Sequence, residues 1–114
     1  MSAFIREEQL GPVLILSLHG DLNADTTPRF EKHLLGAIDQ GADRIAIDGT
    51  ELTYISSAGL RVVLTACKLL KSRQGKLCLF ALQEPVRDIF ELSGFGGIVA
   101  LLLDRAAAET YCRK

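Results

Sequence analysis

The chain has 114 residues and a formal net charge of −1, from 13 basic and 14 acidic side chains. Hydrophobic residues make up 48% and charged residues 24%, close to the average of globular domains, which excludes a disordered chain. The near-neutral charge provides no basic surface for nucleic acid. We therefore expect a single domain over residues 1–114 that does not bind nucleic acid directly.

The apolar runs are short. Residues 13–16 and 98–103 fall far below the roughly 20 residues that span a bilayer. Residues 1–10 lack the basic and apolar regions of a secretory signal. The sequence therefore predicts a cytoplasmic protein without membrane insertion.

Strand-like and helix-like periods alternate along the chain. Residues 4–9 and 13–18 are predicted strands around a turn at residues 10–12, which indicates an antiparallel hairpin. Residues 20–26 are predicted to be a loop. Thr27 and Pro28 then suit an N-cap and the first position of a helix that extends to about residue 41.

Three further strand and helix pairs follow. Residues 44–48 form a predicted strand, and residues 49–55 a connection to a helix over residues 56–72. The uninterrupted apolar run at residues 77–82 is typical of a parallel strand covered on both faces. The remaining predicted elements are a helix at 84–93, a strand at 98–101 and a helix capped by Asp104 that ends near Tyr111. This order, β-β-α-β-α-β-α-β-α, predicts an α/β fold with a mixed sheet of about five strands covered by about four helices.

Cysteine usage and enzyme motifs exclude several kinds of site. Cys67, Cys78 and Cys112 are widely spaced in apolar surroundings, which favours buried thiols over a disulfide framework or a zinc site. HExxH, GxSxG and Walker motifs do not occur. Ser57, His19 and Asp48 contain the side chains of a triad, but no sequence pattern places them together. We expect no catalysis, no metal and no cofactor.

Two adjacent serines, Ser56 and Ser57, stand at the start of the helix predicted over residues 56–72. A serine there satisfies free backbone N–H groups, and the partial positive charge of a helix N-terminus favours an anion. The small residues Ala58 and Gly59 allow another chain to approach closely. Taken alone, the segment is most simply interpreted as an ordinary N-cap.

Taken with its surroundings, the segment resembles the signature of the STAS domain family, the fold of anti-sigma factor antagonists. Residues 45–61 read Ile-Ala-Ile-Asp-Gly-Thr-Glu-Leu-Thr-Tyr-Ile-Ser-Ser-Ala-Gly-Leu-Arg. The family pattern is a strand ending in aspartate, an aromatic residue and then Asp/Ser-Ser-Ser/Ala-Gly-Leu. Gly-Asp-Leu-Asn at residues 20–23 resembles the upstream loop Gly-x-Leu-Asp, so Ser56 and Asn23 stand where the family often has aspartates. Asp21 offers a carboxylate near Asn23.

The resemblance implies a phosphorylation switch. The phosphoacceptor would be Ser57, two residues before Gly59, and the kinase would itself be the anti-sigma factor. The unphosphorylated protein would bind this anti-sigma factor and so regulate transcription indirectly, and a serine phosphatase would reset the switch.

The predicted partner surface combines the loop at 20–25, the helix start at 56–59 and the outward side of the same helix. Loops that follow parallel strands gather at the carboxyl ends of the strands, which would bring these segments together. The partner-binding residues are predicted to be Asp21, Asn23, Ser56, Ala58, Gly59, Arg61, Val62, Thr65 and Leu69.

Two questions stay open from sequence. Val62, Ala66 and Leu69 form a second apolar stripe on the helix, which fits either wide burial or an exposed docking ridge. The alternative function is a constitutive STAS scaffold or binding module in a sensory or transport complex, without serine phosphorylation. A weaker alternative is a small-ligand or nucleotide binder at the same loops.

Overall fold

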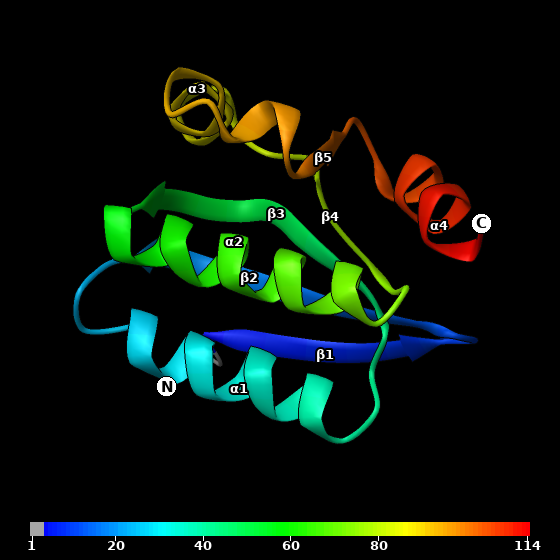
Figure 1. Ribbon diagram of the computed structural model, residues 1–114. Coiled ribbons are helices and arrows are strands. Elements are labelled where there is room, and N and C mark those ends of the chain that lie inside the picture. The colour runs from blue at the N-terminus through cyan, green and yellow to red at the C-terminus, as the bar shows by residue number, and fades with distance from the viewer. Residues whose placement is uncertain (1–3) are drawn as a thin grey trace.

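The computed structural model describes residues 4–114 and contains a five-stranded sheet in the order β1-β2-β3-β4-β5 (Figure 1). The strands are β1 (Ile5–Leu10), β2 (Val13–Leu22), β3 (Arg44–Ile55), β4 (Lys76–Phe80) and β5 (Ala100–Leu102). β1 is antiparallel to β2, and the other neighbours are parallel. The predicted hairpin and mixed sheet are therefore confirmed.

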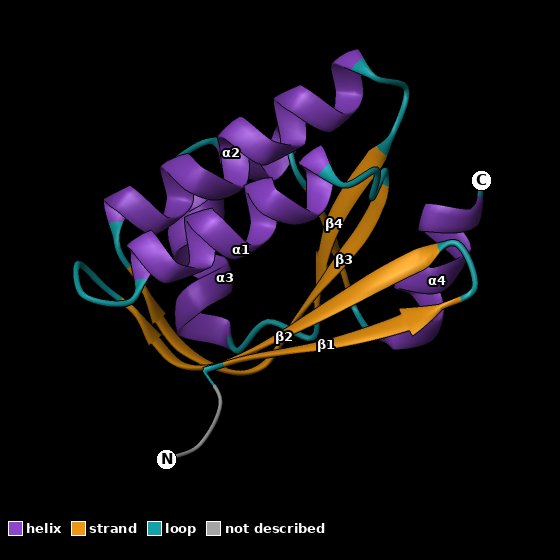
Figure 2. Ribbon diagram, turned by 90° about the horizontal axis from the view of Figure 1, so that it is seen from below, coloured by secondary structure: helices purple, strands orange, loops and turns teal. Residues whose placement is uncertain are grey.

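Helices cover both faces of the sheet, as Figure 2 shows. The α-helices are α1 (Thr27–Asp39), α2 (Ser57–Ser72), α3 (Glu84–Leu92) and α4 (Arg105–Arg113), and a 3-10 turn, η1, spans Phe95–Gly97. α1, α2 and α3 lie on one face and α4 lies on the other. Four α-helices within the described residues match the predicted number and order.

The alternation of side chains along β2 divides the core in two. Leu14, Leu16 and Leu18 pack with α1, α2 and α3. Val13 and Ile15 point to the opposite face and pack with α4. β4 is buried on both faces in the same way, which confirms the parallel strand predicted from the apolar run at 77–82, although the strand ends at Phe80.

Two strands are longer than predicted. β2 continues to Leu22 and β3 to Ile55, so the predicted loop from residue 20 and the predicted connection at 49–55 are wrong in these parts. The extended segments pair with each other through register shifts, up to the pair Leu22 and Ile55. Glycine, aspartate and threonine give them the composition of a turn. Long-range pairing and burial of Leu22, Leu52 and Ile55 override that local preference.

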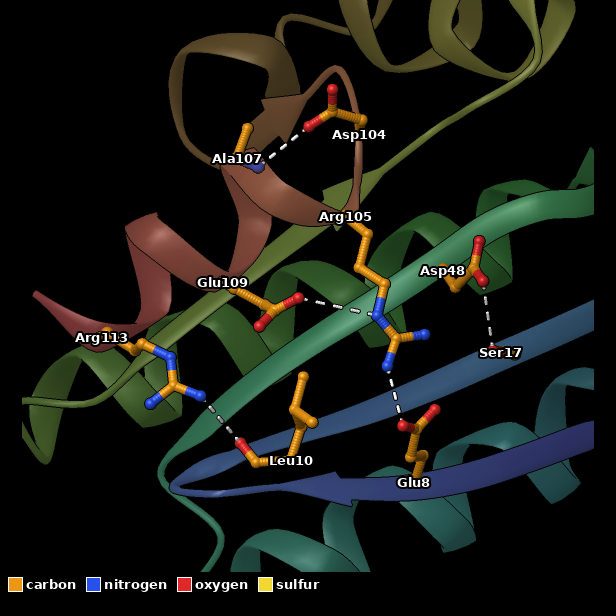
Figure 3. Close-up of polar contacts among 9 residues, drawn as sticks. All are labelled: Glu8, Leu10, Ser17, Asp48, Asp104, Arg105, Ala107, Glu109 and Arg113. Carbon is orange, nitrogen blue, oxygen red and sulfur yellow. Dashed lines mark hydrogen bonds and ion pairs between the residues drawn. The ribbon is translucent and has the colours of Figure 1, made fainter.

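Smaller differences concern the ends of elements. α1 has Thr26 as its N-cap residue, whereas Thr27 is a buried first residue whose hydroxyl donates to the Asn23 carbonyl at 2.6 Å. β5 begins two residues later than predicted. The predicted cap of α4 is confirmed, because the Asp104 carboxylate accepts from the Ala107 backbone N–H at 2.9 Å (Figure 3).

Cys67, Cys78 and Cys112 are buried free thiols, as predicted. Within residues 4–114, no helix is both long enough and apolar enough to cross a membrane.

Candidate functional site

The candidate site begins where β3 ends and α2 starts. The backbone N–H of Ser56 donates to the Leu22 carbonyl at 2.9 Å, which ties the start of α2 to the end of β2. Leu22 and Ile55 are paired in the sheet, so the loop after β2 and the start of α2 are neighbours. This confirms the predicted gathering of both segments at the carboxyl ends of the strands.

The two serines have different structural roles. Ser56 is the N-cap of α2, with extended backbone angles, and its hydroxyl accepts from the Gly59 backbone N–H at 3.2 Å. Ser57 is the first residue of the helix and is exposed. Its hydroxyl makes no hydrogen bond to the described part of the chain. The Ser56 hydroxyl therefore serves the fold, and the Ser57 hydroxyl is available to a partner.

Gly59 is required by close packing. A Cβ atom at this position would lie 2.8 Å from Leu22 Cδ2 and 2.9 Å from Ile55 Cγ1. Both neighbours are fully buried side chains at the ends of the two paired strands. The glycine therefore lets α2 start directly over the sheet, which fixes the position of Ser57.

Side-chain hydrogen bonds hold the loop after β2 in one shape. Asn23 Oδ1 accepts from the backbone N–H groups of Asp25 at 2.9 Å and Thr26 at 3.1 Å. The Thr26 hydroxyl donates to the Asp21 carbonyl at 2.7 Å, and the Thr53 hydroxyl donates to the Asp21 carboxylate. Asn23 thus acts as an acceptor of backbone bonds, and Asp21 is joined to β3.

Sequence reasoning missed the contributions of Thr26 and Thr53. The spacing of Asn23 and Thr26 carries a local signal, because asparagine often accepts hydrogen bonds from the backbone two or three residues later. Thr53 carries no such signal, since its partner Asp21 is 32 residues away.

The predicted partner face of α2 is partly wrong. Arg61 and Thr65 are exposed and Leu69 is half-buried, but Val62 is only 6% exposed. Val62 belongs to the core shared with α1, which lies beside α2 (Figure 2). Ala66, one turn along, is fully buried. The second apolar stripe is therefore mainly core, because α2 packs against both the sheet and a neighbouring helix.

The structure does not assemble a triad from Ser57, His19 and Asp48. Asp48 accepts from the Ser17 hydroxyl at 3.3 Å, a contact drawn in Figure 3, and from the Thr50 hydroxyl at 2.6 Å. His19 Nδ1 is buried and has no hydrogen-bond partner among the described residues. His19 and Asp48 line a groove of about 310 Å³ on the side of the sheet that carries α4, and Ser57 is not part of it.

A wider groove of about 870 Å³ lies between β1 and α1, away from the serines. It reaches the segment before β3, at the opposite end of that strand from Ser57. His33, on its wall, pairs with Glu7 of β1 at 2.7 Å. Ser57 lines neither of these grooves and is exposed, which suits recognition by a protein more than enclosure of a small molecule.

Comparison with known proteins identifies the family. The family model described as the STAS domain matches residues 5–108. BtrV of Bordetella bronchiseptica, assigned as an anti-sigma factor antagonist, is 41% identical over 101 residues, which cover 89% of this chain and 87% of BtrV. The anti-sigma-B factor antagonist of Listeria monocytogenes is 34% identical over 83 residues, 72% of each chain.

Solved structures show the same fold. The anti-sigma factor antagonist SpoIIAA of Bacillus superposes in its unphosphorylated form with a TM-score of 0.80 and 23% identity, covering 94% of this chain and 95% of SpoIIAA. Its phosphorylated form superposes with a TM-score of 0.73 and 22% identity, covering 94% and 98%. The chain therefore belongs to the STAS domain family, and the curated relatives reported above are named as anti-sigma factor antagonists.

Proposed function

We propose that this protein is a cytoplasmic anti-sigma factor antagonist whose binding to an anti-sigma factor is controlled by phosphorylation of Ser57. The proposal rests on a difference between the hydroxyl groups of the two serines. Ser57 presents an exposed hydroxyl at the first position of α2, whereas the Ser56 hydroxyl is engaged with Gly59. The names of the curated relatives, and the existence of SpoIIAA in phosphorylated and unphosphorylated forms, support this function.

The anti-sigma factor would also be the serine kinase, and a serine phosphatase would reverse the modification. The protein itself would act only as a binding switch, without catalysis and without direct contact to nucleic acid. The proposed contact surface consists of Asp21, Asn23, Ser56, Ala58, Arg61, Thr65 and Leu69. Gly59 and Val62, both predicted from sequence, are not part of it because both are buried.

A phosphate on Ser57 changes binding through local electrostatics. It adds a charge of about −1.5 to −2 at neutral pH. The N-terminus of α2 stabilises this charge within the free protein, so the fold needs no rearrangement. In a complex, the partner would have to remove water from the phosphate, which costs several kcal/mol unless the partner provides cations. Phosphorylation should therefore weaken the complex more than it changes folding stability.

Incubation with ATP and the anti-sigma factor kinase of the same organism, followed by intact mass measurement, tests the proposal. The wild-type protein should gain one phosphate, and phosphopeptide mapping should place it on Ser57. The Ser56→Ala variant should also gain one phosphate, and Ser57→Ala should gain none. A wild-type protein that binds the kinase with ATP but is never modified would instead favour a constitutive binding module.

A further inference from the structure

Two buried thiols lie in contact on the side of the sheet opposite α1 and α2. Cys78 is in the middle of β4 and Cys112 is in the last turn of α4, and their Sγ atoms are 3.7 Å apart. Both residues are fully buried in the core between the sheet and α4. The two cysteines are 34 positions apart in the sequence, so only the fold brings them together.

Disulfide formation requires only a short movement of the two sulfur atoms. A disulfide bond is about 2.05 Å long, so the sulfur atoms would have to move together by roughly 1.7 Å. The neighbours in this core are small: Ala46 and Ala100 are the register partners of Cys78 on β3 and β5, and Ala108 lies one turn before Cys112 on α4. Cys112 lies in the last turn of a nine-residue helix, and helix ends adjust and open more readily than the middle of a sheet.

The hydrogen bond between the two thiols and the positive charges near α4 favour Cys112 as the nucleophile. Arg44 Nη1 donates to the Cys112 carbonyl at 2.7 Å, and Lys76 Nζ donates to the Tyr111 carbonyl at 3.3 Å. The hydrogen bond between the Cys112 and Cys78 thiols, together with the charges of Arg44 and Lys76, lowers the pKa of the Cys112 thiol, although burial acts in the opposite direction. The same hydrogen bond and burial raise the pKa of Cys78.

We infer that Cys78 and Cys112 are a reversible oxidation site. A hydroperoxide oxidises the two thiols to a disulfide, which covalently links α4 to β4. The Cys112 thiolate attacks the peroxide, the O–O bond breaks, and a sulfenic acid forms while the leaving oxygen is protonated. The Cys78 sulfur then attacks the Cys112 sulfur, the S–O bond breaks, and water leaves with the Cys78 proton. The two thiols together lose two electrons. The hydroperoxide is reduced to an alcohol, or to water in the case of hydrogen peroxide, and the disulfide step releases one molecule of water. This site is separate from Ser57 and does not depend on the proposed function.

Cys67 provides an internal control. It lies on α2, on the other side of the sheet, and its Sγ is 3.8 Å from the Ile98 carbonyl. Burial raises the pKa of this thiol, with a smaller opposing effect of Lys71. Cys67 is thus a buried thiol in the same protein without a second cysteine beside it.

The test is treatment of the full chain with hydrogen peroxide, then denaturation, alkylation of free thiols and intact mass measurement. The wild-type protein should lose the mass of two hydrogen atoms and retain one alkylated thiol, and peptide mapping should link residue 78 to residue 112. The Cys67→Ala variant should lose the same mass and retain no alkylated thiol. Cys78→Ala and Cys112→Ala should form no intramolecular disulfide. A reductant should restore the three thiols of the wild type.

The melting temperature tests whether the covalent link between α4 and β4 stabilises the fold. The disulfide closes a long loop and should raise the melting temperature of the wild type by several degrees relative to the reduced protein. Three free thiols in wild type after oxidation, or a linkage that involves Cys67, would overturn the inference. An unchanged melting temperature of the linked protein would overturn the proposal that the disulfide stabilises the attachment of α4 to the sheet. These measurements on the wild-type protein test the inference even if a cysteine variant folds poorly.

Discussion

The hydroxyl of Ser56 accepts a hydrogen bond from the backbone N–H of Gly59 at 3.2 Å. This bond satisfies one of the free N–H groups of the first turn of α2, so the Ser56 hydroxyl acts as the cap of the helix. Ser57, one residue later, makes no comparable bond to the described residues and is exposed. Replacement of Ser56 and replacement of Ser57 should therefore have different effects on folding stability and on partner binding.

Stability should separate the two serines. Ser56→Ala removes the N-cap and should lower the free energy of unfolding by about 1 kcal/mol. Ser57→Ala changes an exposed position and should alter it by less than about 0.5 kcal/mol. Urea denaturation of both variants and wild type measures the difference. Equal losses in both variants would contradict the assignment of Ser56 as the cap.

Binding should respond to charge at Ser57. Ser57→Glu should weaken the complex with the anti-sigma factor at least tenfold, because the carboxylate must lose water inside the interface. Ser57→Ala should bind as the unphosphorylated wild type does and should stay bound when ATP is added. Isothermal titration calorimetry with and without ATP compares the variants. A Ser57→Glu protein that binds as tightly as wild type would contradict the electrostatic mechanism.

Two glycines should respond to alanine in opposite directions. Gly59→Ala introduces a Cβ 2.8 Å from Leu22 and should lower the free energy of unfolding by about 1–2 kcal/mol, despite the better helix propensity of alanine. A Cβ at Gly36, in the interior of α1, meets no atom within 4 Å. Gly36→Ala should therefore raise the free energy of unfolding by about 0.5–1 kcal/mol. Thermal and urea denaturation of the matched pair check both signs.

The two neighbours Arg61 and Val62 should separate binding from folding. Val62→Asp places a carboxylate in the core and should lower the free energy of unfolding by about 3 kcal/mol or more. Arg61→Glu changes an exposed residue beside Ser57 and should leave that free energy within about 0.5 kcal/mol, while affinity for the anti-sigma factor falls. Circular dichroism melts and calorimetry measure the two effects. A stable Val62→Asp protein would show that α1 does not cover this side chain.

The loop after β2 should tolerate aspartate at Asn23 but not alanine. Asn23→Asp keeps the oxygen that accepts from Asp25 and Thr26, and its charge lies near the N-terminus of α1. Stability should be equal to or higher than that of wild type. Asn23→Ala leaves two backbone N–H groups to water and should cost about 1 kcal/mol. Urea denaturation distinguishes the variants, and equal stability of all three proteins would contradict this role of Asn23.

Local patterns in the sequence were sufficient to predict the order of the elements and the start of the candidate site. The apolar run at the start of β2 and the helical spacing of apolar residues in α1 reflect which side chains are buried, and this information is present in the residues themselves. Asp104 could be recognised as a cap from its position, because capping is a contact across three residues. The start of α2 was predicted for the same reason, and the signature around Ser57 and Gly59 identified the family.

Tertiary structure decided the features that depend on distant partners. The second halves of β2 and β3 have turn-like composition and become strands only by pairing with each other. The position of Val62 in the helical spacing fits either an exposed or a buried side chain. Val62 is buried because α1 lies beside α2. The contacts of Asp21 with Thr53 and of Cys78 with Cys112 join residues more than 30 positions apart. Periodicity shows which side of an element is apolar, but only the assembled fold determines what lies against that side.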